Sequence, residues 1–246
     1  MKPPRALLLD FGGVIADAPR EDPAAPAMVR RLSELLGGAL AEDRIASDLL
    51  AGALAYARWR DEVGTQAEPR ELTHAEVWDG FVTADWPAGA RAAVQQAATP
   101  LAYAWTYRPE WTVRPGIPEV LAAAAARGIP VAVVSNTLCG AAHGDFLARV
   151  GLSGAFETQL YSDEIGVRKP NPEMARRAAR ELGVAVEQAW FVGDSYTRDI
   201  VCARRAGVGA AILMRSPRTD RERPVPGLEP DAVVDDGHGL FALIDS

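Results

Sequence analysis

Two hydrophobic patterns divide this chain of 246 residues. Short, uninterrupted aliphatic runs occur near the N-terminus and again after residue 129, at 6–9, 130–134, 189–192 and 210–213. Runs of this length between turn residues are typical of strands covered on both faces of a parallel sheet. Weaker patterns predict two further strands, at 156–161 and 232–234.

Between the first two strands, residues 27 to about 107 show helical spacing only. Met28, Val29 and Leu32 share one face of a first helix, and Thr73 and Glu76 form a capping box that begins a third. Four helices, the last at 88–98, predict a compact bundle, and no strand is expected between Val14 and Pro130. We expect most tryptophans to pack in or beside the bundle core, namely Trp59, Trp78, Trp86, Trp105 and Trp111.

After residue 115, helices and strands alternate, which predicts a parallel sheet with helices on both faces. We therefore predict an α/β protein with a Rossmann-like core at 1–15 and 112–246. An all-helical domain at 16–111 is inserted after the first strand. The polar, proline-containing stretch 215–230 is predicted to be a surface loop.

The composition argues against several classes of protein. A formal net charge of −7 argues against nucleic-acid binding. With no apolar stretch long enough to span a membrane and no signal-peptide pattern, we expect a cytoplasmic protein without membrane contact. Cys139 and Cys202 lack zinc-site spacing and the three histidines are scattered, so we expect reduced thiols and no histidine metal cluster.

Polar side chains stand where three of the aliphatic strands end. Asp10 follows the first strand, Ser135 and Asn136 end the second, and Asp194 follows a third, with Asp199 five residues later. These strand ends lie at one edge of a parallel sheet, where ligands bind. A buried carboxylate is tolerated only when it is paired or coordinated, so Asp10 is a candidate for chemistry.

Further residues near these strand ends indicate a site for an anion and a site for a cation. Lys169 before Pro170 is one of only two lysines in the chain, among many arginines, which favours a specific role. Two or three carboxylates suit a hard cation such as Mg²⁺, and a hydroxyl with an ammonium binds an anion. A remaining aspartate can act as a nucleophile that becomes phosphorylated. Gly12 and Gly13 allow a tight turn and close approach of a ligand to the main chain.

Four motifs, in order, resemble those of the haloacid dehalogenase (HAD) superfamily of hydrolases along essentially the whole chain. They are L-L-L-D-F-G-G-V at Asp10, V-A-V-V-S-N at Ser135, R-K-P at Lys169, and F-V-G-D-S-Y-T-R-D at Asp194 and Asp199. The helical insertion resembles the family's first type of cap, a domain that closes over the site and selects the leaving group.

This resemblance implies a Mg²⁺-dependent phosphatase that acts on a small phosphorylated metabolite through an aspartyl-phosphate on Asp10. Mg²⁺ would be held by Asp10, the carbonyl of Gly12, Asp194 and Asp199. Ser135 and the N–H of Asn136 would bind the phosphoryl oxygens beside the Gly12–Gly13 turn. Lys169 would neutralise the negative charge of Asp10 and the phosphoryl group. We expect either a monomer or a homodimer that acts on a small phosphorylated substrate.

The chain departs from the family at Gly12, where phosphatases usually carry an aspartate that protonates the leaving group. We therefore expect activity to fall as the leaving group becomes more basic. Asp17 is a candidate substitute acid. Two alternatives stay open: a dehalogenase-type hydrolase, which also lacks this acid, and a binding or regulatory protein with little turnover. The cap has no lysine for phosphonatase chemistry.

Residues near the cap and the second motif carry weaker expectations. Tyr56, Trp59 and the neighbouring arginines Arg58 and Arg60 are candidates for substrate contact, although a solvated helix face explains them more simply. We expect Cys139 to pack in the core, His143 to lie at the surface and Ser195 to cap a helix.

Overall fold

The computed structural model describes residues 1–17 and 23–245. The chain divides into two compact units. The first, here called the α/β unit, comprises Met1–Pro19, Gly64–Glu71 and Arg108–Ser246. The second, the helical unit, comprises Arg20–Val63 and Leu72–Tyr107. No described helix is both long and apolar enough to cross a membrane.

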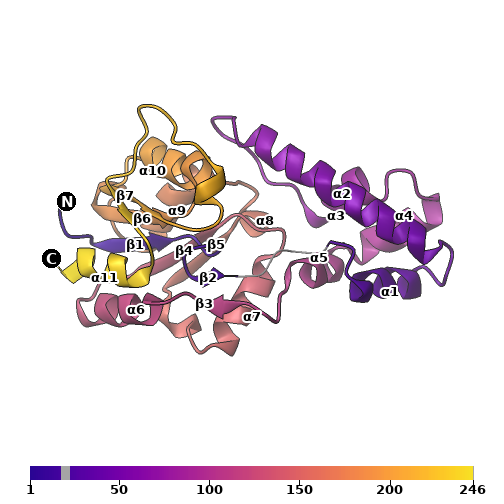
Figure 1. Cartoon of the computed structure of the whole chain (residues 1–246), viewed down its shortest axis with the longest axis horizontal. Coiled ribbons are helices and arrows are strands. Elements are labelled where there is room, and N and C mark those ends of the chain that lie inside the picture. The colour runs from indigo at the N-terminus through magenta and orange to yellow at the C-terminus, as the bar shows by residue number, and fades with distance from the viewer. Residues whose placement is uncertain (18–22, 246) are drawn as a thin grey trace. The chain divides into compact units, whose positions relative to one another are not determined.

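The α/β unit is built on a six-stranded parallel sheet, as the aliphatic runs predict (Figure 1). The strand order is β5-β4-β1-β6-β7-β8, so the first strand of the chain lies in the middle, paired with β4 and β6. The strands are β1 (Ala6–Leu9), β4 (Val131–Ser135), β5 (Thr158–Tyr161), β6 (Ala189–Gly193), β7 (Ala210–Met214) and β8 (Ala232–Val234).

Helices cover both faces of this sheet, which explains why its strands are uninterrupted aliphatic runs. Alternate residues of β1 enter two separate cores: Leu7 and Leu9 on one face, Ala6 and Leu8 on the other. The first core is closed by α6 (Ile117–Ala126), α7 (Gly140–Arg149) and α11 (Gly237–Asp245). The second is closed by α9 (Glu173–Glu181) and α10 (Val201–Ala206).

Short elements complete the α/β unit. Two-residue strands, β2 (Ala16–Asp17) and β3 (Thr112–Val113), pair antiparallel, so the expectation of no strand between Val14 and Pro130 was wrong. Two residues are too few for a recognisable alternation of side chains. The other short elements are η2 (Ser153–Ala155), α8 (Ser162–Ile165), η3 (Val186–Gln188), the π-helix η4 (Tyr196–Ile200) and η5 (Thr219–Arg221).

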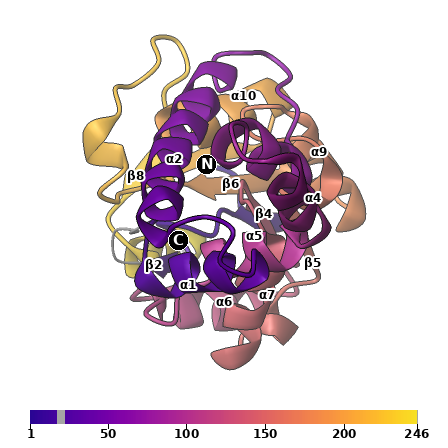
Figure 2. The same cartoon turned by 90° about the vertical axis from the view of Figure 1, so that its right-hand side faces the viewer.

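The helical unit has α1 (Pro26–Leu35), α2 (Glu42–Val63), α3 (His74–Val77), the π-helix η1 (Trp78–Val82), α4 (Ala88–Gln96) and α5 (Ala98–Thr106). The long helix α2 packs against α1 (Figure 2). The capping box of Thr73 and Glu76 is present as predicted. Trp78, Trp86 and Trp105 are buried, whereas Trp111 packs in the α/β unit.

One segment predicted to belong to the helical insertion lies in the α/β unit instead. Residues 64–71 return there between α2 and α3. The Glu71 N–H donates to the Gly166 carbonyl (2.9 Å), and Arg205 donates to the Gln66 carbonyl (2.9 Å). Hydrogen bonds to main-chain carbonyls have no periodic signature, so hydrophobic spacing could not place the segment.

Candidate active site

Three carboxylates meet at the carboxyl edge of the sheet, where the strand ends were predicted to converge. Asp10 directly follows β1, Asp194 directly follows β6, and Asp199 lies in the π-helix η4. Their nearest carboxylate oxygens all lie within 4.8 Å of one another. The two strands that flank β1, β4 and β6, therefore bring the second and fourth motifs beside the first.

Lys169 lies between two of these carboxylates. Its Nζ is 2.7 Å from Asp10 Oδ1 and 2.6 Å from Asp199 Oδ1, and it donates to the Val134 carbonyl (2.8 Å). Burial alone would lower the pKa of Lys169, but Asp10 and Asp199 outweigh burial and raise it. Lys169 is therefore a fixed positive charge at the site.

The acidic groups carry more negative charge than this lysine balances. Burial raises the pKa of Asp10, and Lys169 opposes that shift only in part. Burial, together with the charges of Asp10 and Asp199, raises the pKa of Asp194 to about 7. A raised pKa means that burial destabilises the ionised form of a carboxylate, and a bound divalent cation would stabilise that form. The donor set is oxygen only, which fits Mg²⁺.

The two glycines after Asp10 have different surroundings. Gly13 has a φ of +75°, and an added Cβ would lie 2.1 Å from Asp194 Oδ2, so the turn needs glycine there. At Gly12 an added Cβ would meet no atom of the described residues within 4 Å. Among residues 1–17 and 23–245, no steric contact therefore explains why glycine occupies the position of the missing acid.

A buried arginine that the sequence analysis did not identify supports this turn. Arg114 donates to the Gly13 carbonyl, and also to the carbonyls of Arg215 (2.9 Å) and Asp235 (3.0 Å). Asp17, the candidate substitute acid, has its Oδ1 3.6 Å from Arg114 Nη1. Asp17 thus forms an ion pair with the arginine that supports the turn.

The second motif is joined to the Lys169 loop by one amide side chain. Asn136 Nδ2 donates to the Lys169 carbonyl (2.9 Å), and its Oδ1 accepts from the Lys169 N–H (2.7 Å). Ser135, the last residue of β4, is buried beside it. The Asn136 side chain thus fixes two loops of the site, a role that the sequence analysis did not assign.

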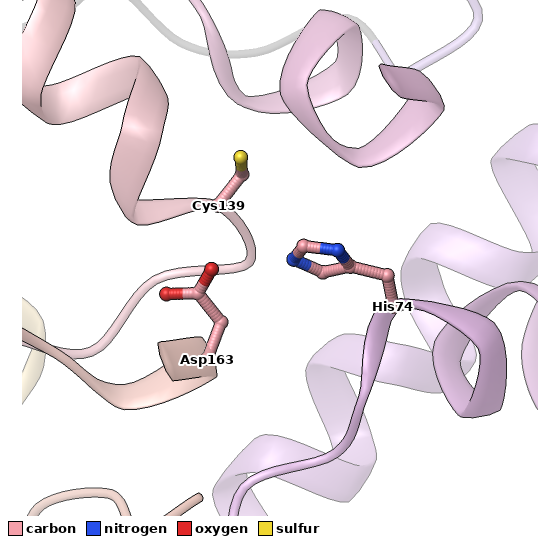
Figure 3. Close-up of side chains that lie close together, drawn as sticks. All are labelled: His74, Cys139 and Asp163. Carbon is pink, nitrogen blue, oxygen red and sulfur yellow. The ribbon is translucent and has the colours of Figure 1, made fainter. Parts of the chain in front are cut away.

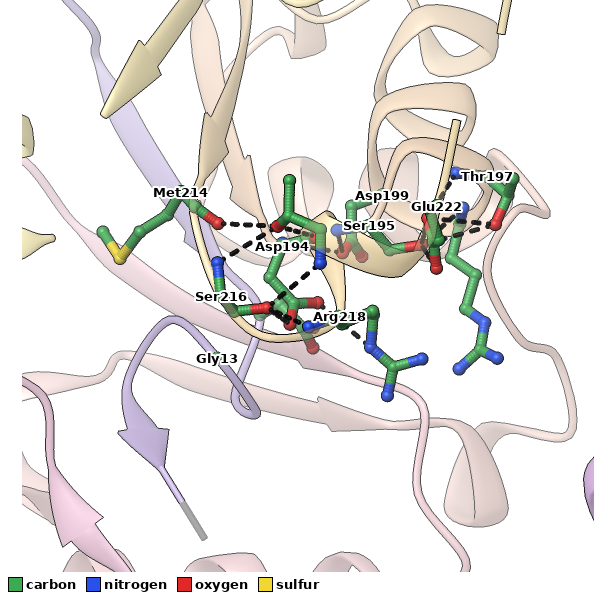
Figure 4. A network of polar contacts seen from close by, with 12 residues as sticks. Gly13, Asp194, Ser195, Thr197, Asp199, Met214, Ser216, Arg218 and Glu222 are labelled. Atoms are coloured by element: carbon green, nitrogen blue, oxygen red, sulfur yellow. Dashed lines mark hydrogen bonds and ion pairs between the residues drawn. The ribbon is translucent and has the colours of Figure 1, made fainter. Parts of the chain in front are cut away.

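The loop after β7 holds Asp194, so the prediction that all of 215–230 is a surface loop was wrong (Figure 4). Ser216 Oγ donates to Asp194 Oδ2 (2.6 Å), and Thr219 Oγ1 donates to the Asp194 carbonyl (2.6 Å). Arg218 Nε lies 3.4 Å from Asp194 Oδ1. A polar loop that binds a buried carboxylate has the same composition as one that faces solvent.

The predicted cap of η4 is confirmed. Ser195 Oγ accepts from the Arg198 N–H (3.1 Å) and donates to the Glu222 carboxylate (2.8 Å). The same carboxylate accepts from the Thr197 N–H (3.2 Å). Glu222 thereby fixes the beginning of the π-helix that carries Asp199.

His143 is buried, so the expectation that it lies at the surface was wrong. Its ring stacks on Phe11, the residue after Asp10, at a centroid distance of 3.8 Å. Burial lowers the pKa of His143 to about 3, so the ring is neutral. Its helix, α7, presents it to the core because positions 143, 146 and 147 share one buried face.

Cys139 is buried as predicted, and burial raises the pKa of its thiol. It directly precedes α7, and its side chain lies near that of Asp163 (Figure 3). The carboxylate of Asp163 accepts a hydrogen bond from the Gly140 N–H (3.0 Å). Cys202 is buried as well, and both thiols are free. Neither cysteine has the lowered thiol pKa of a reactive nucleophile.

The family is settled by the match of residues 4–207 to the model of the haloacid dehalogenase-like hydrolases. The chain belongs to this family. HAD-like hydrolases of known structure share its fold: the HAD-hydrolase YfnB from Bacillus subtilis, bound to magnesium, superposes with a TM-score of 0.63 at 19% identity. That comparison covers 100% of both chains.

Named relatives of this HAD-like hydrolase match over shorter stretches. A glyceraldehyde 3-phosphate phosphatase from Methanopyrus kandleri is 38% identical over 40% of this chain and 42% of its own length. A phosphoglycolate phosphatase from Rhodospirillum rubrum is 37% identical over 60% of this chain and 56% of its own. The chain thus spans about half the length of the relatives it matches.

Proposed function

We propose that the protein is a Mg²⁺-dependent phosphatase that hydrolyses a small phosphorylated metabolite through an aspartyl-phosphate on Asp10. One observation carries the proposal: Asp10, Asp194 and Asp199 form an oxygen-only cluster, and the buried Lys169 pairs with Asp10 and Asp199. The named relatives are phosphatases of small metabolites, and YfnB, which has the same fold, is bound to magnesium. We place the protein in the cytoplasm as a monomer or homodimer.

Asp10, Asp194 and Asp199, with the carbonyl of Gly12, would hold Mg²⁺. The ion would supply charge neutralisation between the attacking carboxylate and the phosphoryl group. Lys169 neutralises the second side of the same carboxylate, so two anions can approach each other. Ser135, the N–H of Asn136 and the turn at Gly12 and Gly13 would bind the phosphoryl oxygens.

The reaction then has two displacements at phosphorus. An Asp10 oxygen bonds to phosphorus while the bond to the leaving oxygen breaks, and the leaving group takes a proton from solvent. Water next attacks phosphorus, which releases phosphate and restores the Asp10 carboxylate. With Gly12 in place of an acid, the first step favours leaving groups that need little protonation, such as anomeric sugar, aryl or acyl phosphates.

Gly12 also favours a second candidate function, that of a binding or regulatory protein with slow turnover. Without a base at this position, attack by water on the aspartyl-phosphate is slowed. A dehalogenase would use Asp10 against carbon, without need of a cation. The presence of Asp194 and Asp199 beside Asp10 favours phosphorus chemistry over that alternative.

The test is phosphate release from sugar, nucleotide, aryl and acyl phosphates, with Mg²⁺ or with EDTA, for the wild type and Asp10→Asn. We expect release that requires Mg²⁺, is absent in the variant and is fastest for aryl and acyl phosphates. Folded wild-type protein that binds Mg²⁺ and releases no phosphate from any of these substrates would favour the regulatory function instead.

A further inference from the structure

We propose that Glu71 is a positioning residue of this site, which holds the Ser135–Asn136 loop and the Lys169 loop in one fixed relation. The inference rests on the proposed phosphatase function. Glu71 ends the 64–71 segment that returns to the α/β unit, and none of the four motifs includes it. Its carboxylate is buried, as is its partner Arg168, each with a side chain 2% exposed.

The two oxygens of this carboxylate serve two different loops. Oε1 accepts a hydrogen bond from Arg168 Nη1 at 2.9 Å, and Arg168 directly precedes Lys169. Oε2 accepts from Ser162 Oγ at 2.6 Å. One oxygen is therefore hydrogen-bonded to the third motif through Arg168, and the other is connected to the second motif through Ser162.

Ser162 forms the second branch, the connection from Glu71 to the second motif. Its Oγ accepts from the Thr137 N–H at 3.0 Å, and Thr137 directly follows Asn136. The Asn136 amide in turn binds both main-chain groups of Lys169. The contacts thus form a closed ring: Glu71, Arg168, Lys169, Asn136, Thr137, Ser162 and Glu71 again.

The segment that carries Glu71 is itself fixed to the α/β unit. The Glu71 N–H binds the Gly166 carbonyl (2.9 Å), and the Arg168 N–H binds the Pro69 carbonyl (3.3 Å). The backbone of Glu71 therefore cannot shift without moving the turn before Lys169. A displacement of a catalytic group by about 1 Å can cost on the order of 100-fold in rate, so this ring acts on catalysis without touching substrate.

Stability alone does not require an ion pair here. Replacement of a buried ion pair by apolar side chains of similar volume is often neutral or stabilising, whereas removal of one partner is strongly destabilising. This difference separates a purely structural role of the ion pair from a role in positioning the two loops. If the pair is only structural, an apolar pair that restores stability also restores turnover; if it positions two loops, turnover stays low.

The experiment uses the 246-residue chain and compares Glu71→Gln, Ser162→Ala and the double variant Glu71→Leu with Arg168→Met. Each is measured for melting temperature, kcat and KM, and for the affinity of beryllofluoride with Mg²⁺, which mimics the phosphoryl group on Asp10 without turnover. Glu68→Gln, an exposed glutamate of the same segment, is the matched control.

We expect Glu71→Gln and the double variant to lower kcat by at least about tenfold and to weaken beryllofluoride binding similarly. The double variant should melt near the wild-type temperature, and Glu68→Gln should match wild type throughout. Wild-type kcat in a folded double variant would overturn the proposal. If that variant does not fold, wild-type kcat in Ser162→Ala, which breaks only the branch to Thr137, would overturn it. A wild type that neither releases phosphate nor binds beryllofluoride would instead refute the phosphatase function itself.

Discussion

Gly12 and Gly13 stand side by side in the sequence, yet the structure constrains only one of them. Gly13 combines a positive φ with a close approach to Asp194, whereas no described residue lies within 4 Å of a Cβ added at Gly12. Gly13 is therefore a requirement of the fold at the site. Gly12 is a choice of chemistry, because the described residues leave room there for a larger side chain.

Substitution by alanine separates these two roles. We expect Gly13→Ala to lower the free energy of unfolding by at least about 2 kcal/mol, because its Cβ would collide with Asp194 in a left-handed backbone. Gly12→Ala, the matched control, should change stability by less than about 0.5 kcal/mol. Urea denaturation of both variants measures the difference. Equal destabilisation would contradict the geometry of the turn.

An aspartate at Gly12 tests the chemical role of this open position. We expect Gly12→Asp to raise kcat on alkyl phosphates by roughly 10- to 100-fold, because it supplies a general acid, and to change aryl phosphate rates far less. The measurement is kcat against the pKa of the leaving alcohol. Gly12→Asn, which has similar volume and no proton to donate, is the control. A slope that Gly12→Asp leaves as steep as in the wild type would count against the idea.

At the scale of elements, the loop after β1 is packed against α7 through an aromatic cluster. Phe11 contacts His143 face to face. Trp111 meets both of these rings edge-on, and Phe146 meets Phe11 edge-on. The backbone that carries Asp10 into the site is therefore held by apolar packing that includes a neutral imidazole. Protonation of that imidazole would place a charge in the core.

This packing predicts a pH dependence of stability. The pKa of His143 is lowered to about 3 in the folded protein, below its ordinary value of 6.5. Such a group contributes stability that is full above pH 6.5 and is lost as the pH falls toward 3. Between pH 7 and pH 4.5 the wild type should lose roughly 2–3 kcal/mol more than His143→Phe, which keeps the stacking.

Urea unfolding at several pH values measures this difference. Replacement of the exposed His238 by Gln is the control, and it should follow the wild type. If His143→Phe and the wild type lose stability in parallel on acidification, then His143 is not held neutral in the core.

The same scale shows which elements a sequence can predict. β1, β4 and β6 were predicted because strands buried on both faces must be aliphatic, and their carboxyl ends converge in any parallel sheet. The placement of Asp10 and Asp194 followed from that topology, whereas the roles of Lys169 and Asp199 were implied by the resemblance to the family. By contrast, β2 and β3 are too short for a pattern, and the loop at Ser216–Thr219 looks like any polar loop.

At the scale of the whole molecule, two units could be predicted, but the path of the chain between them could not. A change from aliphatic runs to helical spacing marks the insertion, whereas the return of residues 64–71 depends on main-chain hydrogen bonds and one buried ion pair. His143 was misplaced for a similar reason, since only tertiary packing tells a buried histidine from an exposed one. The groups that support the site are thus placed by tertiary contacts that the sequence pattern does not reveal.

The central claim is that Asp10 becomes phosphorylated, and chemical trapping tests it most directly. The wild type is mixed with an aryl phosphate and Mg²⁺, quenched in borohydride, digested, and its Asp10 peptide is examined by mass spectrometry. Borohydride reduces an aspartyl-phosphate to homoserine. We predict homoserine at position 10, dependent on Mg²⁺ and less abundant in Gly12→Asp, whose intermediate should hydrolyse faster. Phosphate release with an unmodified Asp10 at every quench time would contradict the account.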